Sequence, residues 1–195
     1  MLNIPKSLNK FRTTVPGAGE VVDWVLYDTQ RFDGGAQSLD YFLTTSTSKL
    51  VSNMKAAGQM PGNEAFVLRG LGVSIRPNLN DPTLLPTVTD VQNIIDAGVL
   101  RLNIGSKSYN EYPLYLLPDG SGASGIGFTN VDATDIQTAC NGVPDPRNVY
   151  ALSKPLVLEP SLSFNARIEW VNTVVLTATF AVRVMLFGEI ARPIQ

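Results

Sequence analysis

The chain has 195 residues, of which 44% are hydrophobic and only 16% are charged, and its formal net charge is −2. Globular proteins usually have about 25% charged residues. Because the cores of protein interfaces are depleted in charge, part of this surface is expected to face another subunit. The balance of charge provides no general basic field, so no specific nucleic-acid partner is expected.

The chain contains no histidine and one cysteine, Cys140. Histidine is the most common general base and the most common neutral metal ligand, so histidine-based catalysis and histidine-based metal sites are excluded. A single cysteine cannot form an intrachain disulfide. We therefore expect a protein that is not an enzyme and that binds no cofactor or metal ion.

Residues 1–19 are expected to form an N-terminal arm, followed by a single domain over residues 20–195. The arm contains a local cationic cluster of Lys6, Lys10 and Arg12, with no acidic residue before Glu20. Two interpretations remain open: a solvated terminal arm, or an arm that contacts anionic lipid or a neighbouring subunit. The arm has no apolar core of signal-peptide length, so synthesis in a cytoplasm is expected.

The first half of the domain has two candidate strands. Residues 21–27 are rich in β-branched and aromatic side chains, and the Asp33–Gly35 segment after them predicts a turn. Residues 66–76 predict a long strand, in which Gly70 and Gly72 favour the close approach of another backbone or a bulge.

Two short helices are predicted. The first spans residues 46–57, with a hydroxyl cap from Ser46, Thr47 or Ser48, apolar residues on one face, and Gly58 in the position that ends it. The second lies near residues 91–95 with a threonine cap, and Gly98 ends it.

Residues 99–104 alternate between apolar and polar side chains, and residues 109–117 are predicted to pair with them in a hairpin. Three tyrosines, Tyr109, Tyr112 and Tyr115, cluster in the second half of this hairpin. Packing in a core or an interface is the default interpretation, and a sugar-binding platform is the alternative.

Residues 118–148 lack strong periodicity and are predicted to form a long excursion that is functional or covers an interface. Residues 120–125 match the dinucleotide-binding fingerprint, but no strand precedes them and no helix follows, so we predict a flexible loop. Residues 46–49 match the Ser-x-x-Lys of penicillin-recognising enzymes without the Lys-Thr-Gly strand that such sites need.

Carboxylates provide the remaining candidates for chemistry. Two pairs are candidates for acid and base, Asp33 with Asp40 and Asp132 with Asp135, and turn or capping roles are favoured for both. The loops at residues 78–81 and 130–135 have oxygen ligands for a hard cation but lack the twelve-residue calcium-loop pattern.

The last third of the chain has the clearest pattern. Strands resume at Leu156, and residues 162–170 and 176–186 alternate with a period of two, which is typical of strands buried on one face. Several strands, one or two short helices and long excursions predict an all-β fold, a single jelly-roll β-sandwich.

Four segments resemble coat proteins of icosahedral viruses: Val99–Gly105, Tyr112–Pro118, Leu158–Phe164 and Val184–Ile194. The layout is similar to that of major capsid proteins of bacterial and archaeal viruses with an upright single jelly roll, many of which enclose a membrane. The resemblance implies a virion protein made in the host cytoplasm, associated into trimeric or pseudo-hexameric capsomers. It also implies contacts with other capsid proteins and, through the arm, with an internal membrane.

The leading hypothesis is therefore a structural capsid subunit that self-associates into an icosahedral shell. The second is a carbohydrate- or receptor-binding β-sandwich, lectin-like or a viral attachment protein, with the three tyrosines or the glycine loop at residues 120–125 as its platform. A third, a hydrolase that uses a carboxylate pair, has the least support.

Overall fold

The computed structural model describes residues 18–77, 88–117, 124–129, 136–140 and 149–193. In this part of the chain, two four-stranded antiparallel sheets, a two-stranded hairpin and one short α-helix account for most residues. The prediction of an all-β fold is thereby confirmed. No helix among the described residues is long and apolar enough to cross a membrane.

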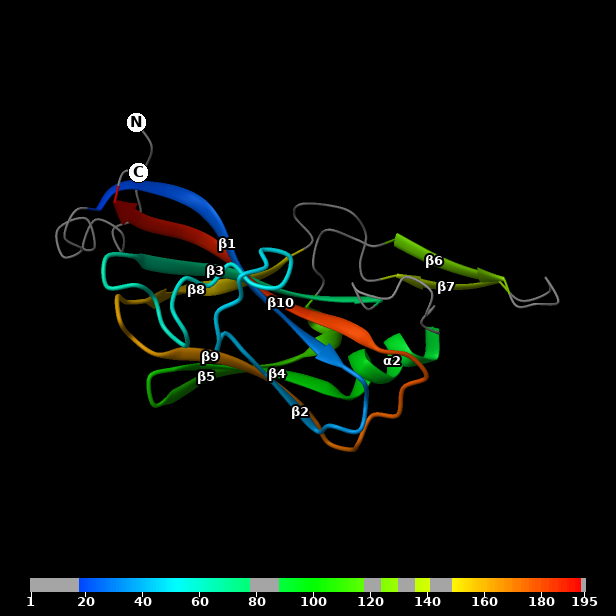
Figure 1. The fold of residues 1–195 in the computed structure, drawn as a ribbon. Coiled ribbons are helices and arrows are strands. Elements are labelled where there is room, and N and C mark those ends of the chain that lie inside the picture. Colours follow the sequence, from blue (N-terminus) through cyan, green and yellow to red (C-terminus); the bar gives the residue numbers. More distant parts are fainter. Residues whose placement is uncertain (1–17, 78–87, 118–123, 130–135, 141–148, 194–195) are drawn as a thin grey trace.

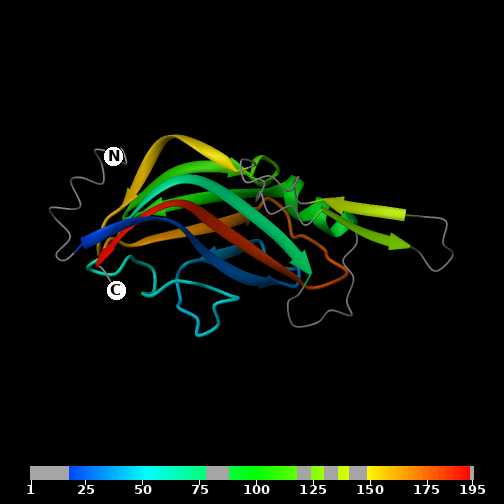
Figure 2. The same cartoon turned by 90° about the horizontal axis from the view of Figure 1, so that it is seen from above.

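The two large sheets face each other as two layers (Figures 1 and 2). Sheet A has the order β1 (Ala18–Phe32), β10 (Phe180–Pro193), β3 (Ala65–Pro77), β8 (Tyr150–Leu158). Sheet B has the order β2 (Ser38–Tyr41), β9 (Phe164–Trp170), β4 (Gly98–Ile104), β5 (Lys107–Pro113).

The core lies between the two sheets and is built from alternate residues of their strands. In β4 and β9 every second side chain is buried, and Leu100 on β4 lies opposite Ile168 on β9. Successive side chains of a strand point to opposite faces, so this alternation places one face in the core and leaves the other face to polar residues.

The hairpin of β4 and β5 is confirmed, but β5 ends at Pro113 and not at residue 117. The strands of the last third are also found, although β8 begins at Tyr150 rather than Leu156 and β10 begins at Phe180 rather than residue 176.

Strand β10 lies at the centre of sheet A and pairs with β1 on one side and β3 on the other. Its register with β3 shifts between Phe187 and Gly188, so that Arg69 has no partner opposite it. A Cβ atom on Gly188 would lie 1.9 Å from the carbonyl oxygen of Val67. Only glycine allows the two backbones to approach this closely.

The prediction of a helix over residues 46–57 is wrong, because the structure forms turns there. The N–H groups of Val51 and Ser52 both reach the carbonyl of Ser48, which makes a single turn. Asn53 then bonds to the backbone of β1 instead of continuing a helix. Tertiary hydrogen bonds from polar side chains have overridden the local helical pattern.

The second predicted helix is confirmed as α2 (Val88–Ala97). Its inward-facing Ile94 is fully buried, and the indole N–H of Trp170 donates to the carbonyl of Ile94 at 3.0 Å. Gly98 ends the helix in close contact with Leu114, since a Cβ there would lie 2.4 Å from the Leu114 Cδ1.

The excursion after β5 begins with a 3₁₀ helix, η1 (Leu114–Leu116), and contains a hairpin that the sequence did not predict. Strands β6 (Ser124–Thr129) and β7 (Ile136–Cys140) pair with each other and extend away from the two sheets (Figures 1 and 2). The prediction of a loop is wrong for these two segments, because glycines and polar residues obscure their period. Asp132, Asp135 and the two proposed cation loops lie outside the described residues.

Candidate functional site

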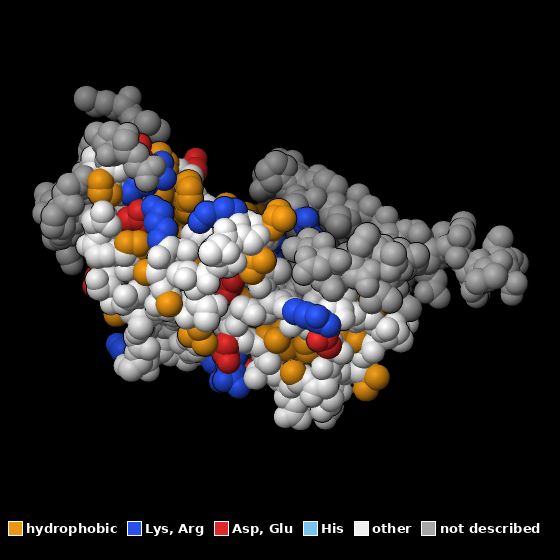
Figure 3. Space-filling model, in the orientation of Figure 1, with side chains coloured by type: hydrophobic (Ala, Val, Ile, Leu, Met, Phe, Trp, Pro, Cys, Tyr) orange, Lys and Arg blue, Asp and Glu red, His pale blue; other side chains and the backbone are white. Residues whose placement is uncertain are grey.

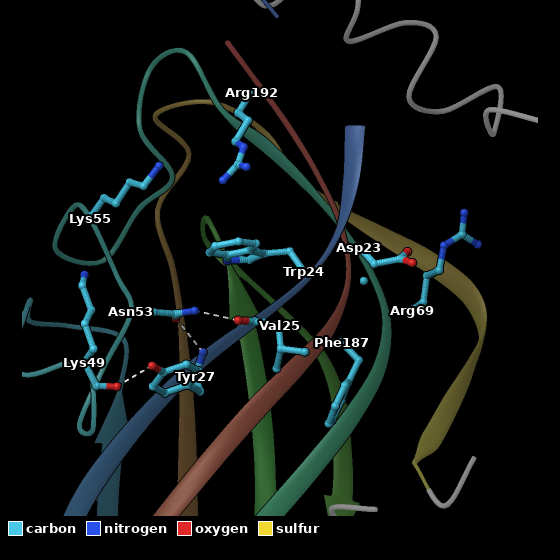
Figure 4. Close-up of a pocket in the computed structure, with 11 residues that line it drawn as sticks. Asp23, Trp24, Val25, Tyr27, Lys49, Asn53, Lys55, Arg69, Phe187 and Arg192 are labelled. Atoms are coloured by element: carbon cyan, nitrogen blue, oxygen red, sulfur yellow. Dashed lines mark hydrogen bonds between the residues drawn. The ribbon is translucent and has the colours of Figure 1, made fainter. Parts of the chain in front are cut away.

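An open groove of about 850 Å³ lies beside β1, at the edge of sheet A (Figure 4). Its lining combines aromatic and aliphatic side chains with four cations. It is formed by Asp23, Trp24, Val25, Tyr27, Lys49, Asn53, Lys55, Arg69, Phe187, Gly188 and Arg192. Lys49 and Lys55 come from the connection between β2 and β3, and Arg192 comes from the end of β10.

One wall of the groove is the segment over which the sequence predicts a helix. The side-chain oxygen of Asn53 accepts the N–H of Tyr27 at 2.9 Å, and its amide nitrogen donates to the carbonyl of Val25 at 2.7 Å. The Asn53 N–H donates to the carbonyl of Tyr27 at 3.3 Å. Asn53 thus forms hydrogen bonds with the edge of β1 as a neighbouring strand would, but only with the backbone of Tyr27 and the carbonyl of Val25.

The edge of β1 continues past this contact toward its N-terminal end. Along an antiparallel strand, alternate residues direct both backbone groups to the same side. Because Tyr27 faces Asn53 in this way, Val25, Asp23 and Val21 direct their N–H groups to the same free side. Among the described residues β10 is the only strand that pairs with β1, and it lies on the other side, so the amides of these three residues have no strand partner there. An unpaired edge of this kind readily accepts another strand.

The charges around the groove are largely compensated. Arg192 pairs with Glu20 at 2.5 Å and lies 5.2 Å above the centre of the Trp24 ring. Arg69 pairs with Glu189 at 2.9 Å.

A third pair joins Lys55 to the buried Glu64. Neither Lys49 nor Asp23 has an ion-pair partner among the described residues, and their opposite charges balance. The groove is therefore neutral, and Figure 3 shows basic, acidic and hydrophobic side chains mixed on the visible face.

A buried carboxyl lies on β1 close to the wall segment. Asp28 accepts the N–H of Phe42 at 2.7 Å and that of Thr29 at 3.0 Å. Burial raises the pKa of Asp28, and these hydrogen bonds oppose the effect only in part. Tyr41 is fully buried, and its pKa is raised by burial and by the negative charge of Asp28.

The outer face of sheet B has a different character, with a row of ion pairs that crosses all four strands. Arg167 lies 2.9 Å from Glu169 and 3.7 Å from Asp40. Arg101 lies 2.9 Å from Glu111 and 3.3 Å from Glu169. These charges satisfy one another on an exposed surface, where each pair contributes about 0–1 kcal/mol.

The predicted carboxylate pair of Asp33 and Asp40 is engaged with different partners. Asp33 accepts a hydrogen bond from Thr179 at 2.6 Å and pairs with Arg31 at 2.8 Å. These two contacts lower the pKa of Asp33, whereas Asp40 belongs to the row on sheet B. Among the described residues, no group of three or more cysteine, aspartate or glutamate side chains is placed to hold a metal ion.

The three tyrosines have different surroundings. Tyr112 is half-buried and packs on Tyr150 of β8, with ring centres 4.9 Å apart, and burial raises its pKa. Tyr109 and Tyr115 are 43% and 62% exposed. The ring contact of Tyr112 is therefore with Tyr150 and not with the other two tyrosines, and Lys6, Lys10 and Arg12 lie outside the described residues.

Sequence reasoning did not identify the groove, because its residues come from four separate segments. The pairing of these segments, and not any local motif, brings them together. Comparisons of the chain with protein-family models, with curated proteins and with solved structures found no match.

Proposed function

We propose that this chain is a structural protein of a virion, a single jelly-roll capsid subunit that self-associates into capsomers and a shell. The carrying observation is the strand order. Without the β6–β7 hairpin, eight strands remain among the described residues, and β1 pairs with β10, β2 with β9, β3 with β8 and β4 with β5. A long antiparallel ribbon rolled in this way gives the two facing sheets of a jelly roll, an architecture used by viral coat proteins.

The surface also supports self-association. Among the described residues, large apolar side chains that lie outside the core and are about half exposed or more include Leu43, Leu50, Tyr115, Val171 and Val175. Together with the low share of charged residues, they supply apolar area that an assembly buries.

The test is the state of the purified protein in solution and under the electron microscope. We expect sedimentation velocity to show oligomers whose share grows with concentration, and negative-stain images to show capsomers, trimers or pseudo-hexamers, or closed shells. A protein that remains monomeric across the whole concentration range and forms no regular particles would contradict the proposal.

A carbohydrate- or receptor-binding module is the second candidate, and the groove is the observation that favours it. Its volume of about 850 Å³ lies within the usual range of about 300–1,000 Å³ for ligand sites. Titration calorimetry with a panel of neutral and acidic glycans tests this candidate. Saturable heat that is lost in Tyr27→Ala and kept in Tyr115→Ala would favour it, and the absence of heat with every glycan would reject it.

A further inference from the structure

We propose that the edge of β1, which has no neighbouring strand among the described residues, pairs with the same edge of a second copy around a two-fold axis. Two copies of sheet A then form one continuous eight-stranded sheet. This inference rests on the proposed self-association and assigns one of its contacts to named residues. Three features support it: the outward-directed backbone groups of Val21 and Asp23, the neutral groove beside them, and the end of the Asn53 contact at the carbonyl of Val25.

The free stretch has a defined length. Asn53 occupies the edge at Tyr27 and at the carbonyl of Val25, so an added strand cannot extend further in that direction. At the other end, the register of β1 with β10 shifts between Ala18 and Glu20, which breaks the regular spacing at Gly19. Val21 and Asp23 remain as the regularly spaced, outward-directed residues between these two limits.

These limits select one register. An axis at Asp23 places two carboxylates directly opposite each other, which is destabilising. An axis at Val21 pairs Asp23 with the irregular Gly19. An axis at Val22 places Val21 opposite Asp23 of the second copy and Asp23 opposite its Val21. In each of these two pairs, the N–H of each residue donates to the carbonyl of the other.

The occupant is a second copy because the stretch is complementary to itself in this register and because the groove next to it is neutral. A cationic or acidic groove would repel its own image across the axis, whereas compensated ion pairs do not. Such a two-fold contact is isologous, with the same surface contributed by both copies. The strand pair alone is smaller than a standard interface, so this contact is expected to depend on protein concentration.

The first test compares Asp23→Pro with Asp23→Ala. Both variants remove the carboxylate, but only proline removes the N–H that bonds across the axis, and proline is tolerated on an edge strand. We expect Asp23→Ala to dimerise at least as well as the wild type. Asp23→Pro should raise the dimer dissociation constant by about tenfold or more, because symmetry removes two hydrogen bonds. Equal dissociation constants for the two variants, with unchanged circular dichroism, would overturn the proposal.

The second test measures the register and does not depend on proline. Val21→Cys and Asp23→Cys are made separately in a Cys140→Ser background, distinguished by a tag and mixed under mild oxidation. The proposed register places the new thiol of the Val21→Cys copy opposite the new thiol of the Asp23→Cys copy, within disulfide reach. Two copies of the same variant instead hold their thiols diagonally apart. We expect the mixed disulfide dimer to exceed both homodimers several-fold, and a merely statistical mixture would contradict the register.

The outcomes separate this inference from the proposed function. If the wild type forms no oligomer of any kind, both fall. If the wild type assembles, but Asp23→Pro assembles equally well and the mixed disulfide shows no excess, the β1 contact alone is rejected.

Discussion

Asp28 is a buried carboxyl whose protonation couples pH to stability. Its folded-state pKa lies above the value of 3.8 for an unperturbed aspartate. A raised pKa means that the neutral form is favoured in the folded protein. Its contribution to stability is therefore complete below pH 3.8 and is lost as the pH rises through the folded-state pKa.

This sign gives the first prediction. The free energy of unfolding of the wild type minus that of Asp28→Asn should fall as the pH rises through the folded-state pKa of Asp28, because asparagine does not titrate. Asp33 has a lowered pKa, so its contribution to stability rises with pH. Because Asp33 is present in both proteins, this contribution cancels in the difference. Urea unfolding between about pH 3 and 7 measures the difference, and a difference that grows with pH would contradict the assignment.

Gly188 provides the second prediction at this scale. Gly188→Ala should destabilise the protein by about 3 kcal/mol or more, because the new Cβ collides with the backbone of Val67 rather than with a side chain that can move. Gly62→Ala is the matched control, since its Cβ would make an ordinary 3.5 Å contact with Ser161 and its φ is not positive. Thermal and urea unfolding of both variants measure the contrast. Equal stabilities would show that the bulge at Gly188 adjusts.

The connection between β2 and β3 is the element whose structure departs most from its sequence pattern. Leucine, valine, methionine and alanine at helical spacing predict a helix over residues 46–57, yet Asn53 and Ser52 bond to β1 instead. Short helices are marginal without tertiary support. The edge of β1, beside which the structure describes no further strand, offers hydrogen bonds that a local pattern cannot reveal.

Asn53→Ala tests this account. It removes both side-chain bonds to the edge of β1, and we expect a loss of about 1–3 kcal/mol in unfolding free energy. Hydrogen exchange at the amide of Tyr27 should accelerate at the same time. Asn63→Ala, an exposed substitution in the same connection, is the control and should leave both quantities unchanged. Slow exchange at Tyr27 in Asn53→Ala would show that the edge is protected by other means.

At the scale of the whole molecule, the sequence predicted the class of fold but not the pairing of distant strands. The alternation in β4 and β9 identifies buried faces because its period is a local property. The pairing of β1 with β10 joins segments near opposite ends of the chain, and no local pattern specifies it. The groove depends on that pairing, so it could be recognised only in three dimensions.

The exposed loop between β9 and β10 permits a prediction about assembly. Val171 and Val175 are 84% and 78% exposed. Replacing both by serine should change the unfolding free energy by no more than about 0.5 kcal/mol, because neither is packed. Assembly followed by light scattering should shift to higher protein concentration, while Asn172→Ser in the same loop should not shift it. An unchanged assembly curve for the double variant would remove this loop from the contacts between subunits.

The central position of β10 has a consequence for synthesis on the ribosome. Strands β1 and β3 lie on either side of β10 and bond to it rather than to each other. Sheet A therefore lacks its central strand until the end of β10 has left the exit tunnel. We therefore expect this sheet to be completed only after translation has passed β10.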